Sequence, residues 1–303
     1  MATYPNAAGT LSNDVLVAQR FMKSPTAVQR LFQEKIENSF LADAILSGRA
    51  QTDSGAIQYE LDEDQFAVRE PESVKPGAEY PLTTVGGPAL QTAVTVKWGL
   101  DTLVTDESIS RAAMSPVDSG LTKLRNSVVR KVDSVAMSLV STVVTQTQAA
   151  SAPWTGASAN ALLDILLADA TIEGHDRGYA ADTLVVSPTV AAYLAANVKI
   201  LDAQSREGRD NALYTGVLGA IAGKTILRSN HLPVGTDAIL LDRNALGGIA
   251  DESLIGEGYT GAPVQFKQIR EDATDEWRLR ARRVCVPYVS NPLAAVKITG
   301  VVA

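Results

Sequence analysis

The chain has 303 residues, of which 46% are hydrophobic, so it can bury a substantial core in one large domain or two ordinary ones. Its 27 basic and 34 acidic side chains give a formal net charge of -7, which argues against a main surface that neutralises nucleic acid. One cysteine excludes an internal disulfide, and two histidines offer little for metal or acid/base chemistry, so we expect no cofactor and no metal site. Without a signal-peptide layout or a long apolar run, the chain is expected to be soluble, cytoplasmic at synthesis and free of membrane segments.

Residues 1–46 are expected to form an extended arm followed by one amphipathic helix. Ser24 and Pro25 are typical of a helix start, and the apolar residues that follow keep helical spacing as far as Leu46. The next two residues, a Ser-Gly pair, end the helix.

Residues 47–98 are predicted to form a long two-stranded arm. Residues 57–61 and 90–100 alternate apolar and polar side chains, which is the period of strands, and the segment between them is rich in proline, glycine and charge. An isolated hairpin is only marginally stable in water, so such an arm needs another surface to lie on. A neighbouring copy of the chain is the candidate that the sequence offers.

Residues 115–150 predict one very long amphipathic helix. Their apolar side chains recur at gaps that alternate between three and four residues, which keeps them on one face. We expect Ser115 as the N-cap and Pro116 in the first turn. At 1.5 Å per residue the rod would be roughly 50 Å long, and residues 99–152 are expected to be organised around it.

Residues 153–262 predict a small α/β module. We expect helices over residues 161–170 and 188–196, with Ser187 capping the second. The expected strands are 183–186, 225–227 and 238–241, and a polar loop spans residues 202–211.

Three features of the chain could suggest functional sites, but each is better explained by a structural role. Residues 219–225 resemble a phosphate-binding loop, but Leu218 stands where that loop needs a glycine, so we expect a turn that enters a strand. His175 and His231 lie in polar turns without a nucleophile or zinc pattern beside them. Cys285 alternates with apolar residues and is expected to be a core thiol.

Residues 263–303 are expected to return to the core as strands. Residues 264–289 predict a hairpin in which Trp277, Leu279 and Ala281 share one face. Arg278, Arg280 and Arg282 share the other face.

Two rows of opposite charge are candidates for contacts between subunits. Each row could simply be a solvent-exposed face. Alternatively, the acidic row of the arm meets the basic row of the C-terminal strands across a boundary between two copies. Exposed pairs contribute about 0 to 1 kcal/mol each, so their use would lie in register and partner choice. The residues concerned are Glu60, Asp62, Glu63, Asp64, Glu70, Glu72, Lys75, Arg278, Arg280, Arg282 and Arg283.

The order of these elements resembles the major capsid protein of tailed double-stranded DNA phages, the Hong Kong 97-type fold. The segment EPESVKPGAEYPLTTVGGPALQTAVTVKWGLDTLVTDESI is similar to the extended loop and return strand of actinophage shell proteins. The segments DTLVVSPTVAAYL and LRSNHLPVGTDAILLDRNALGGIADE are similar to the axial domain. The segment DEWRLRARRVCVPYVSNPLAAVKITGV is similar to the closing strands.

The resemblance implies an α+β fold in which each segment has a place. Residues 1–46 would be the N-terminal arm and helix, 47–98 the extended loop over the adjacent subunit, 99–152 the peripheral domain with its spine helix, 153–262 the axial domain, and 263–303 the closing strands of the peripheral domain. The axial domain would meet its copies around ring centres, where we place the polar loop with Arg206, Glu207, Arg209 and Asp210.

The implied function is mechanical, and the protein is expected not to be an enzyme. Hexamers and pentamers would close an icosahedral shell around double-stranded DNA, in the virion capsid, after assembly in the host cytoplasm. Because the chain starts at Met1 with a short arm, we expect a separate scaffolding protein, with a portal and a possible decoration protein as further partners. A cross-link between Lys75 and Asn291 lacks a convincing match to the family.

Two rival functions stay open on the sequence alone. One is an encapsulin-type nanocompartment, which shares the fold and encloses protein cargo. The other is an α/β enzyme that uses the module of residues 153–262.

Overall fold

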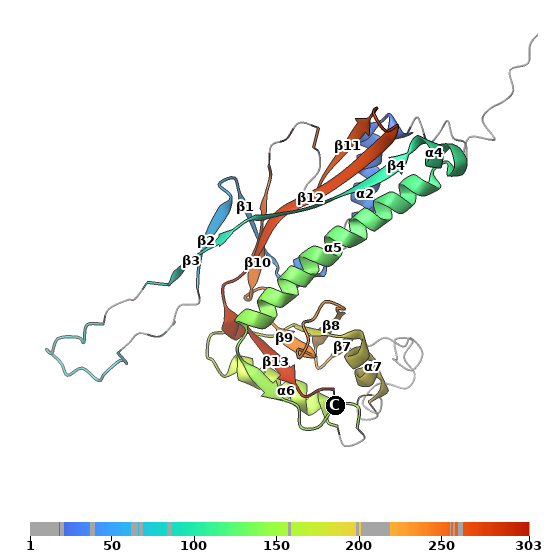
Figure 1. The fold of residues 1–303 in the computed structure, drawn as a ribbon. Helices are drawn as coiled ribbons and strands as arrows, with labels where there is room; N and C mark the ends of the chain where they lie inside the picture. The colour runs from blue at the N-terminus through green and yellow to red at the C-terminus, as the bar shows by residue number, and fades with distance from the viewer. Residues whose placement is uncertain are drawn as a thin grey trace, which may run out of the picture.

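The computed structural model consists of an elongated body, a compact module at one end of it, and a two-stranded arm that leaves the body (Figure 1). Within the described part of the chain, no helix is both long and apolar enough to cross a membrane. The structure describes residues 18, 21–36, 40–61, 66, 69–83, 87–156, 159–197, 200, 219–254, 256, 258–259 and 263–302.

The body is organised around helix α5, Ser115–Val143, whose 29 residues confirm the predicted long helix. Its apolar side chains recur every third or fourth residue, and they face the hydrophobic core of the body. The helix ends before residue 150 because the chain passes into a short strand, β5, Thr147–Ala149. In Figure 1, α5 is the green rod that joins the body to the module.

The start of α5 differs from the prediction, because Met114 and not Ser115 is the N-cap. A preceding helix, α4, Asp106–Ala112, ends two residues before Met114, and Met114 itself has a right-handed helical backbone conformation. The carbonyl of Met114 therefore accepts the first helical hydrogen bond, from Asp118 N at 3.0 Å. Ser115 becomes the first helical residue and makes no capping bond.

A five-stranded sheet covers α5, and its central strand is the long β12 (Figure 1). β4 runs antiparallel along one edge of β12, and β11 and β10 follow one another along the opposite edge. β1 pairs in parallel with β10. The antiparallel pair β11–β12 confirms the predicted hairpin of residues 264–289. The strands are β1, Gly48–Thr52; β4, Val96–Thr105; β10, Gly247–Glu252; β11, Gln265–Glu271; and β12, Glu276–Val289.

Close packing joins this sheet to the helices of the body. At Gly120 of α5, an added Cβ would lie 3.1 Å from Thr102 Cγ2 of β4, so glycine lets the helix approach the sheet. Helix α2, Pro25–Ile36, lies against β11, where the rings of Phe32 and Phe266 stack with centroids 5.0 Å apart.

The single helix predicted to run to Leu46 is wrong, because α2 is followed by a separate helix, α3, Leu41–Ile45. Phe40 is extended, so the helical path is interrupted before α3. Asp133 of α5 then caps α3, since its carboxylate accepts hydrogen bonds from Leu41 N at 3.3 Å and Ala42 N at 2.9 Å. Burial raises the pKa of the Asp133 carboxyl, and these backbone hydrogen bonds oppose the rise.

The module has its own hydrophobic core around a six-stranded sheet with the order β5-β13-β9-β6-β8-β7. Ser187 Oγ caps α7 by accepting a hydrogen bond from Val190 N at 3.3 Å, as predicted. The predicted helices and strands of the module are confirmed. They are α6, Ala161–Glu173; α7, Pro188–Ala196; β6, Thr183–Val186; β8, Lys224–Arg228; and β9, Ala238–Leu241. The module also contains β7, Ala220–Ile221, and β13, Ala295–Thr299, which were not predicted as parts of it.

The segment that resembles a phosphate-binding loop is a tight turn between β7 and β8, as predicted. Ala222 and Gly223 both have positive φ, at 50° and 76°, which is typical of a two-residue hairpin turn. Lys224 Nζ binds Asp169 at 2.8 Å and the carbonyl of Ala181 at 2.7 Å. This lysine therefore fastens β8 to α6.

The sheets divide the chain differently from the predicted segments 153–262 and 263–303. β10 belongs to the first segment but lies in the sheet of the body. β13 belongs to the second segment, follows the 3-10 turn Pro292–Ala294 and lies in the module between β5 and β9. Periodicity predicts that both strands are buried, but it does not identify the strands beside them.

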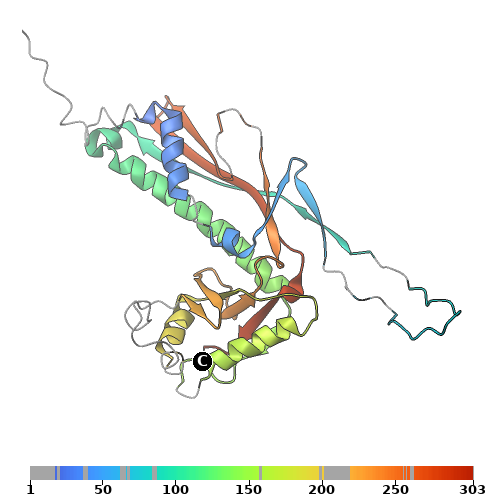
Figure 2. The same ribbon diagram turned by 180° about the vertical axis from the view of Figure 1, so that it is seen from behind.

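The arm is built from β2, Ala56–Glu60, and β3, Leu90–Val94, which pair with each other as a separate two-stranded sheet in the part of the chain that the structure describes (Figures 1 and 2). The long strand predicted for residues 90–100 is therefore two strands, β3 and β4, with a break at Thr95. The break occurs because the chain stops pairing with β2 and begins pairing with β12. The arm consequently leaves the body as a separate two-stranded sheet.

Candidate assembly surface

The root of the arm is held to the body by polar and aromatic contacts. Thr95 N and Thr95 Oγ1 both donate to the carbonyl of Gly55, at 2.9 Å and 3.1 Å, and a short hydrogen bond joins Thr95 Oγ1 to Glu252 of β10. The rings of Tyr59 in β2 and Tyr288 in β12 lie 5.1 Å apart. These contacts fix the direction in which the arm leaves the body.

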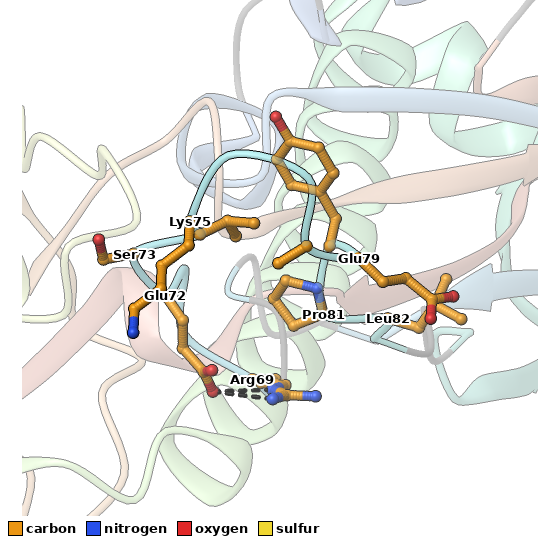
Figure 3. A pocket seen from close by; sticks show the side chains of 10 residues that line it. Arg69, Glu72, Ser73, Lys75, Glu79, Pro81 and Leu82 are labelled. Carbon is orange, nitrogen blue, oxygen red and sulfur yellow. Dashed lines mark hydrogen bonds and ion pairs between the residues drawn. The ribbon is translucent and has the colours of Figure 1, made fainter.

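The described end of the arm, residues 69–83, folds locally around a tight turn. Ala78 N donates to the carbonyl of Lys75 at 3.0 Å, and Gly77 has a φ of 84°, as the third position of a type II turn requires. Arg69 and Glu72 pair at 2.9 Å across a hollow of about 550 Å³ (Figure 3). The described end of the arm therefore has a defined local conformation, although it has no hydrophobic core.

Large apolar side chains are exposed at this end of the arm. Tyr80 is 79% exposed and Leu82 is 85% exposed, and Pro81 holds the backbone between them. Glu79 precedes them and, like Glu70, is exposed without an ion-pair partner among the described residues. An apolar and acidic strip that is left exposed by the described part of its own chain is a candidate for contact with another molecule.

The predicted acidic row is described only in part. Glu60 lies at the outer end of β2, while Glu70, Glu72 and Lys75 lie near the tip. Asp62, Glu63 and Asp64 lie outside the described residues. So does the predicted ring-centre loop with Arg206, Glu207, Arg209 and Asp210.

The predicted basic row of β12 lies on the outer face of the sheet, away from α5. Arg280 holds both carboxylate oxygens of Asp101 in β4, each at 2.7 Å, and Arg278 donates to Glu271 at 2.5 Å. The hydrogen bond from Arg280 lowers the pKa of Asp101, against the effect of burial. Both arginines are about one third exposed and already have partners in their own subunit.

Arg283 does not belong to this row, which corrects its assignment as a subunit contact. Its side chain is fully buried on the inner face and pairs with Asp43 at 2.9 Å and Asp251 at 2.8 Å, over the ring of Phe40. Burial opposes the charge of Arg283, but the two carboxylates raise its pKa above the usual value. Strand alternation in the sequence could have predicted this burial, since Arg283 is four residues from the inward Leu279 and therefore lies on the same face of β12.

Arg282 differs from its neighbours because it has no acidic partner within the described ranges. Its Nε donates to Gln265 Oε1 at 2.7 Å, its Nη2 donates to the carbonyl of Leu254 at 3.3 Å, and its guanidinium lies 3.6 Å from the ring centroid of Tyr259. A hollow of about 400 Å³ lies beside it. The hollow is lined by Lys97, Gly99, Leu100, Asp101, Tyr259, Arg280 and Arg282.

Sequence reasoning did not identify Lys97, Asp101 or Tyr259 as members of this surface. The two β4 residues occupy polar positions of an alternating strand, which is a signal that could have placed them on the outer face. Tyr259 comes from the segment between β10 and β11, and its position follows only from the folded chain.

The other predicted candidates have structural roles. Cys285 is 1% exposed, and burial raises the pKa of its thiol to about 12, as expected for a core residue. His175 Nε2 lies 2.5 Å from Gln146 Nε2, and the backbone N of His231 donates to Ser229 Oγ. In the described part of the chain, no group of three or more acidic, histidine or cysteine side chains is arranged to hold a metal ion.

Solved structures share this architecture at low sequence identity. A structure from Microbacterium phage Oxtober96 aligns with a TM-score of 0.62 and 14% identity, over 86% of this chain and 90% of its own. The capsid structure of cyanophage P-SCSP1u aligns with a TM-score of 0.58 and 13% identity, over 83% and 85%. A virus-like particle from Pyrococcus furiosus aligns with a TM-score of 0.57 and 11% identity, over 89% and 97%. No curated protein sequence matches the chain.

A spine helix under a twisted sheet, a second module and a protruding arm define an α+β structural protein of the Hong Kong 97-type capsid fold. A family model of phage capsid proteins matches residues 89–298, well over half of the chain. The chain belongs to this phage capsid protein family and is a structural major capsid protein of the virion. The resemblance predicted from the sequence is confirmed, and the encapsulin alternative is not favoured.

Proposed function

We propose that copies of this chain assemble into hexamers and pentamers that close an icosahedral shell around double-stranded DNA. The observation that carries the proposal is the arm, whose strands β2 and β3 form a separate two-stranded sheet and whose tip exposes Tyr80 and Leu82. A two-stranded ribbon of this kind is marginal in water by itself. Its natural support is the surface of an adjacent subunit.

The part of the predicted segment 47–98 that leaves the body, from β2 to β3, would lie over the next subunit, and the module would meet its copies around the ring centres. Leu163, Leu166 and Leu167 support the second contact, because they form an exposed apolar stripe on α6, each between 44% and 46% exposed. Shell contacts of this obligate kind bury on the order of 2,000 Å² or more. The predicted ring-centre loop of residues 202–211, with Arg206, Glu207, Arg209 and Asp210, is part of this proposal.

The shell would act mechanically, without catalysis. A formal net charge of -7 suits a container that does not adhere to packaged DNA, since it offers no general excess of cations to phosphates. A separate scaffolding protein, a portal and a possible decoration protein are the further partners that we propose, with assembly in the host cytoplasm.

The test shortens the arm and leaves the body unchanged. Glu60 and Leu90 lie directly opposite each other, so an Asn-Gly turn can join them in place of residues 61–89. Because the removed segment has no core, the shortened subunit should melt at the temperature of the full chain. It should form no particles by sedimentation and negative-stain microscopy at concentrations where the full chain does.

A matched control is Pro76→Asn, which keeps the length of the arm and a glycine-containing turn at its tip. This variant should assemble as the wild type does. Closed shells of normal size from the shortened chain would contradict the proposed role of the arm.

A further inference from the structure

The hollow on the outer face of the sheet carries an excess of positive charge. Lys97, Arg280 and Arg282 line it against one carboxylate, that of Asp101, which Arg280 holds with both oxygens. Arg282 donates only to neutral oxygens, and Lys97 is exposed with no carboxylate within 4.0 Å among the described residues. Two cations of the hollow therefore lack an acidic partner among the described residues of their own subunit.

The same hollow also offers apolar and aromatic surface. The ring of Tyr259 forms part of its wall. Leu103, on the outer face of the same strand, is 53% exposed. A volume of about 400 Å³ falls within the range that proteins use for bound groups, about 300–1,000 Å³. The site suits a side chain or short segment that is both acidic and apolar.

The tip of the arm has this composition. Glu79 is exposed without an ion-pair partner in the described part of the chain, and it stands close in sequence to Tyr80 and Leu82. In Figure 3, Glu79 and Leu82 point away from the pair formed by Arg69 and Glu72. Glu72, which also lies at the tip, is already neutralised by its ion pair with Arg69. Glu70 is also exposed without an ion-pair partner among the described residues, but Glu79 is the carboxylate that stands beside Tyr80 and Leu82.

We infer that the tip segment Glu79–Leu82 of one copy docks into the outer-face hollow of a neighbouring copy, with Glu79 between Lys97 and Arg282. This inference rests on the proposed shell and deepens it, because it names the receiving site. The arm reaches away from its own body, so its own hollow is not the partner (Figures 1 and 2). Double-stranded DNA fits the hollow less well, since Asp101 and Glu271 already neutralise the adjacent arginines.

A charge-exchange experiment tests the pairing. Glu79→Lys and Lys97→Glu should each raise the subunit concentration needed for particles by up to about fivefold, the upper effect of one exposed ion pair. The double variant should return towards the wild-type concentration. Glu70→Lys is the matched control, because it makes the same charge change on the arm outside the docking segment and should assemble normally. Both Lys97 and Glu79 are exposed, so melting temperatures should not change.

A cysteine pair provides a second readout. Assembled particles of Glu79→Cys with Lys97→Cys should form ladders of cross-linked subunits on oxidation, and Glu70→Cys with Lys97→Cys should not. The native Cys285 is buried and stays out of this reaction.

The possible failures are distinguishable. Normal assembly of both single variants, without cross-linking, would overturn the docking site while the shell stands. Normal assembly of Lys97→Glu with less DNA in the purified particles would assign the hollow to nucleic acid and overturn the inference. Absence of particles from the wild type would overturn the shell and the inference together.

Discussion

At the scale of single residues, charge patterns predicted the outer face of β12 but not the partners of its arginines. Arg278, Arg280 and Arg282 do share a face, as strand alternation requires. Their partners Asp101 and Glu271 lie on other strands, and the sequence contains no record of that register. The pairing of Glu72 with Arg280, which the two charge rows suggested, now competes with an intramolecular partner on each side.

Arg283 gives the sharpest prediction at this scale. Replacing it with alanine leaves Asp43 and Asp251 close together without their shared cation, and removing one partner from a buried pair costs roughly 3–5 kcal/mol. Arg283→Ala should therefore lower the free energy of unfolding by about this amount in denaturant titrations of the unassembled subunit. Arg30→Ala is the control, because the pair of Arg30 with Glu34 is largely exposed and should change stability by less than about 1 kcal/mol. Equal effects of the two variants would contradict the buried role.

At the scale of elements, periodicity predicted the existence of most helices and strands, and tertiary contacts decided where they end. α5 and the β11–β12 hairpin follow from their spacing. The break at Thr95 and the separation of α3 from α2 do not, because each depends on a distant partner: Glu252 for the first and Asp133 for the second. β10 lies in the sheet of the body and β13 in the sheet of the module, because each pairs with strands that are distant in the sequence.

The contact between α5 and the sheet makes a prediction at this scale. A valine at position 120 adds two methyl groups where even a Cβ lies 3.1 Å from Thr102, and overpacking of this kind costs about 1–3 kcal/mol. Gly120→Val should lower the melting temperature of the subunit, although valine is a better helix former than glycine. Ser119→Val, on the exposed side of the same helix turn, is the matched control and should change stability by about 0.5 kcal/mol or less. A stabilised Gly120→Val subunit would show that the helix does not need this close approach.

At the scale of the whole molecule, the arm distinguishes this chain from a self-contained domain. The body and the module each have a hydrophobic core, but the arm has exposed apolar residues at its tip, and its strands form a separate two-stranded sheet. The sequence predicted this feature because residues 62–89 are too poor in apolar side chains to form a core and too long for an ordinary connection. It could not identify the receiving surface, which combines β4, β12 and Tyr259.

The most direct test of the account is a cryo-electron microscopy map of the particles that the full chain forms. We predict a closed shell in which residues 69–83 of each copy lie on the outer face of an adjacent copy's sheet, with Glu79 beside Lys97. A map in which the arm folds back on its own subunit, with no repeated contact to another copy, would contradict the account.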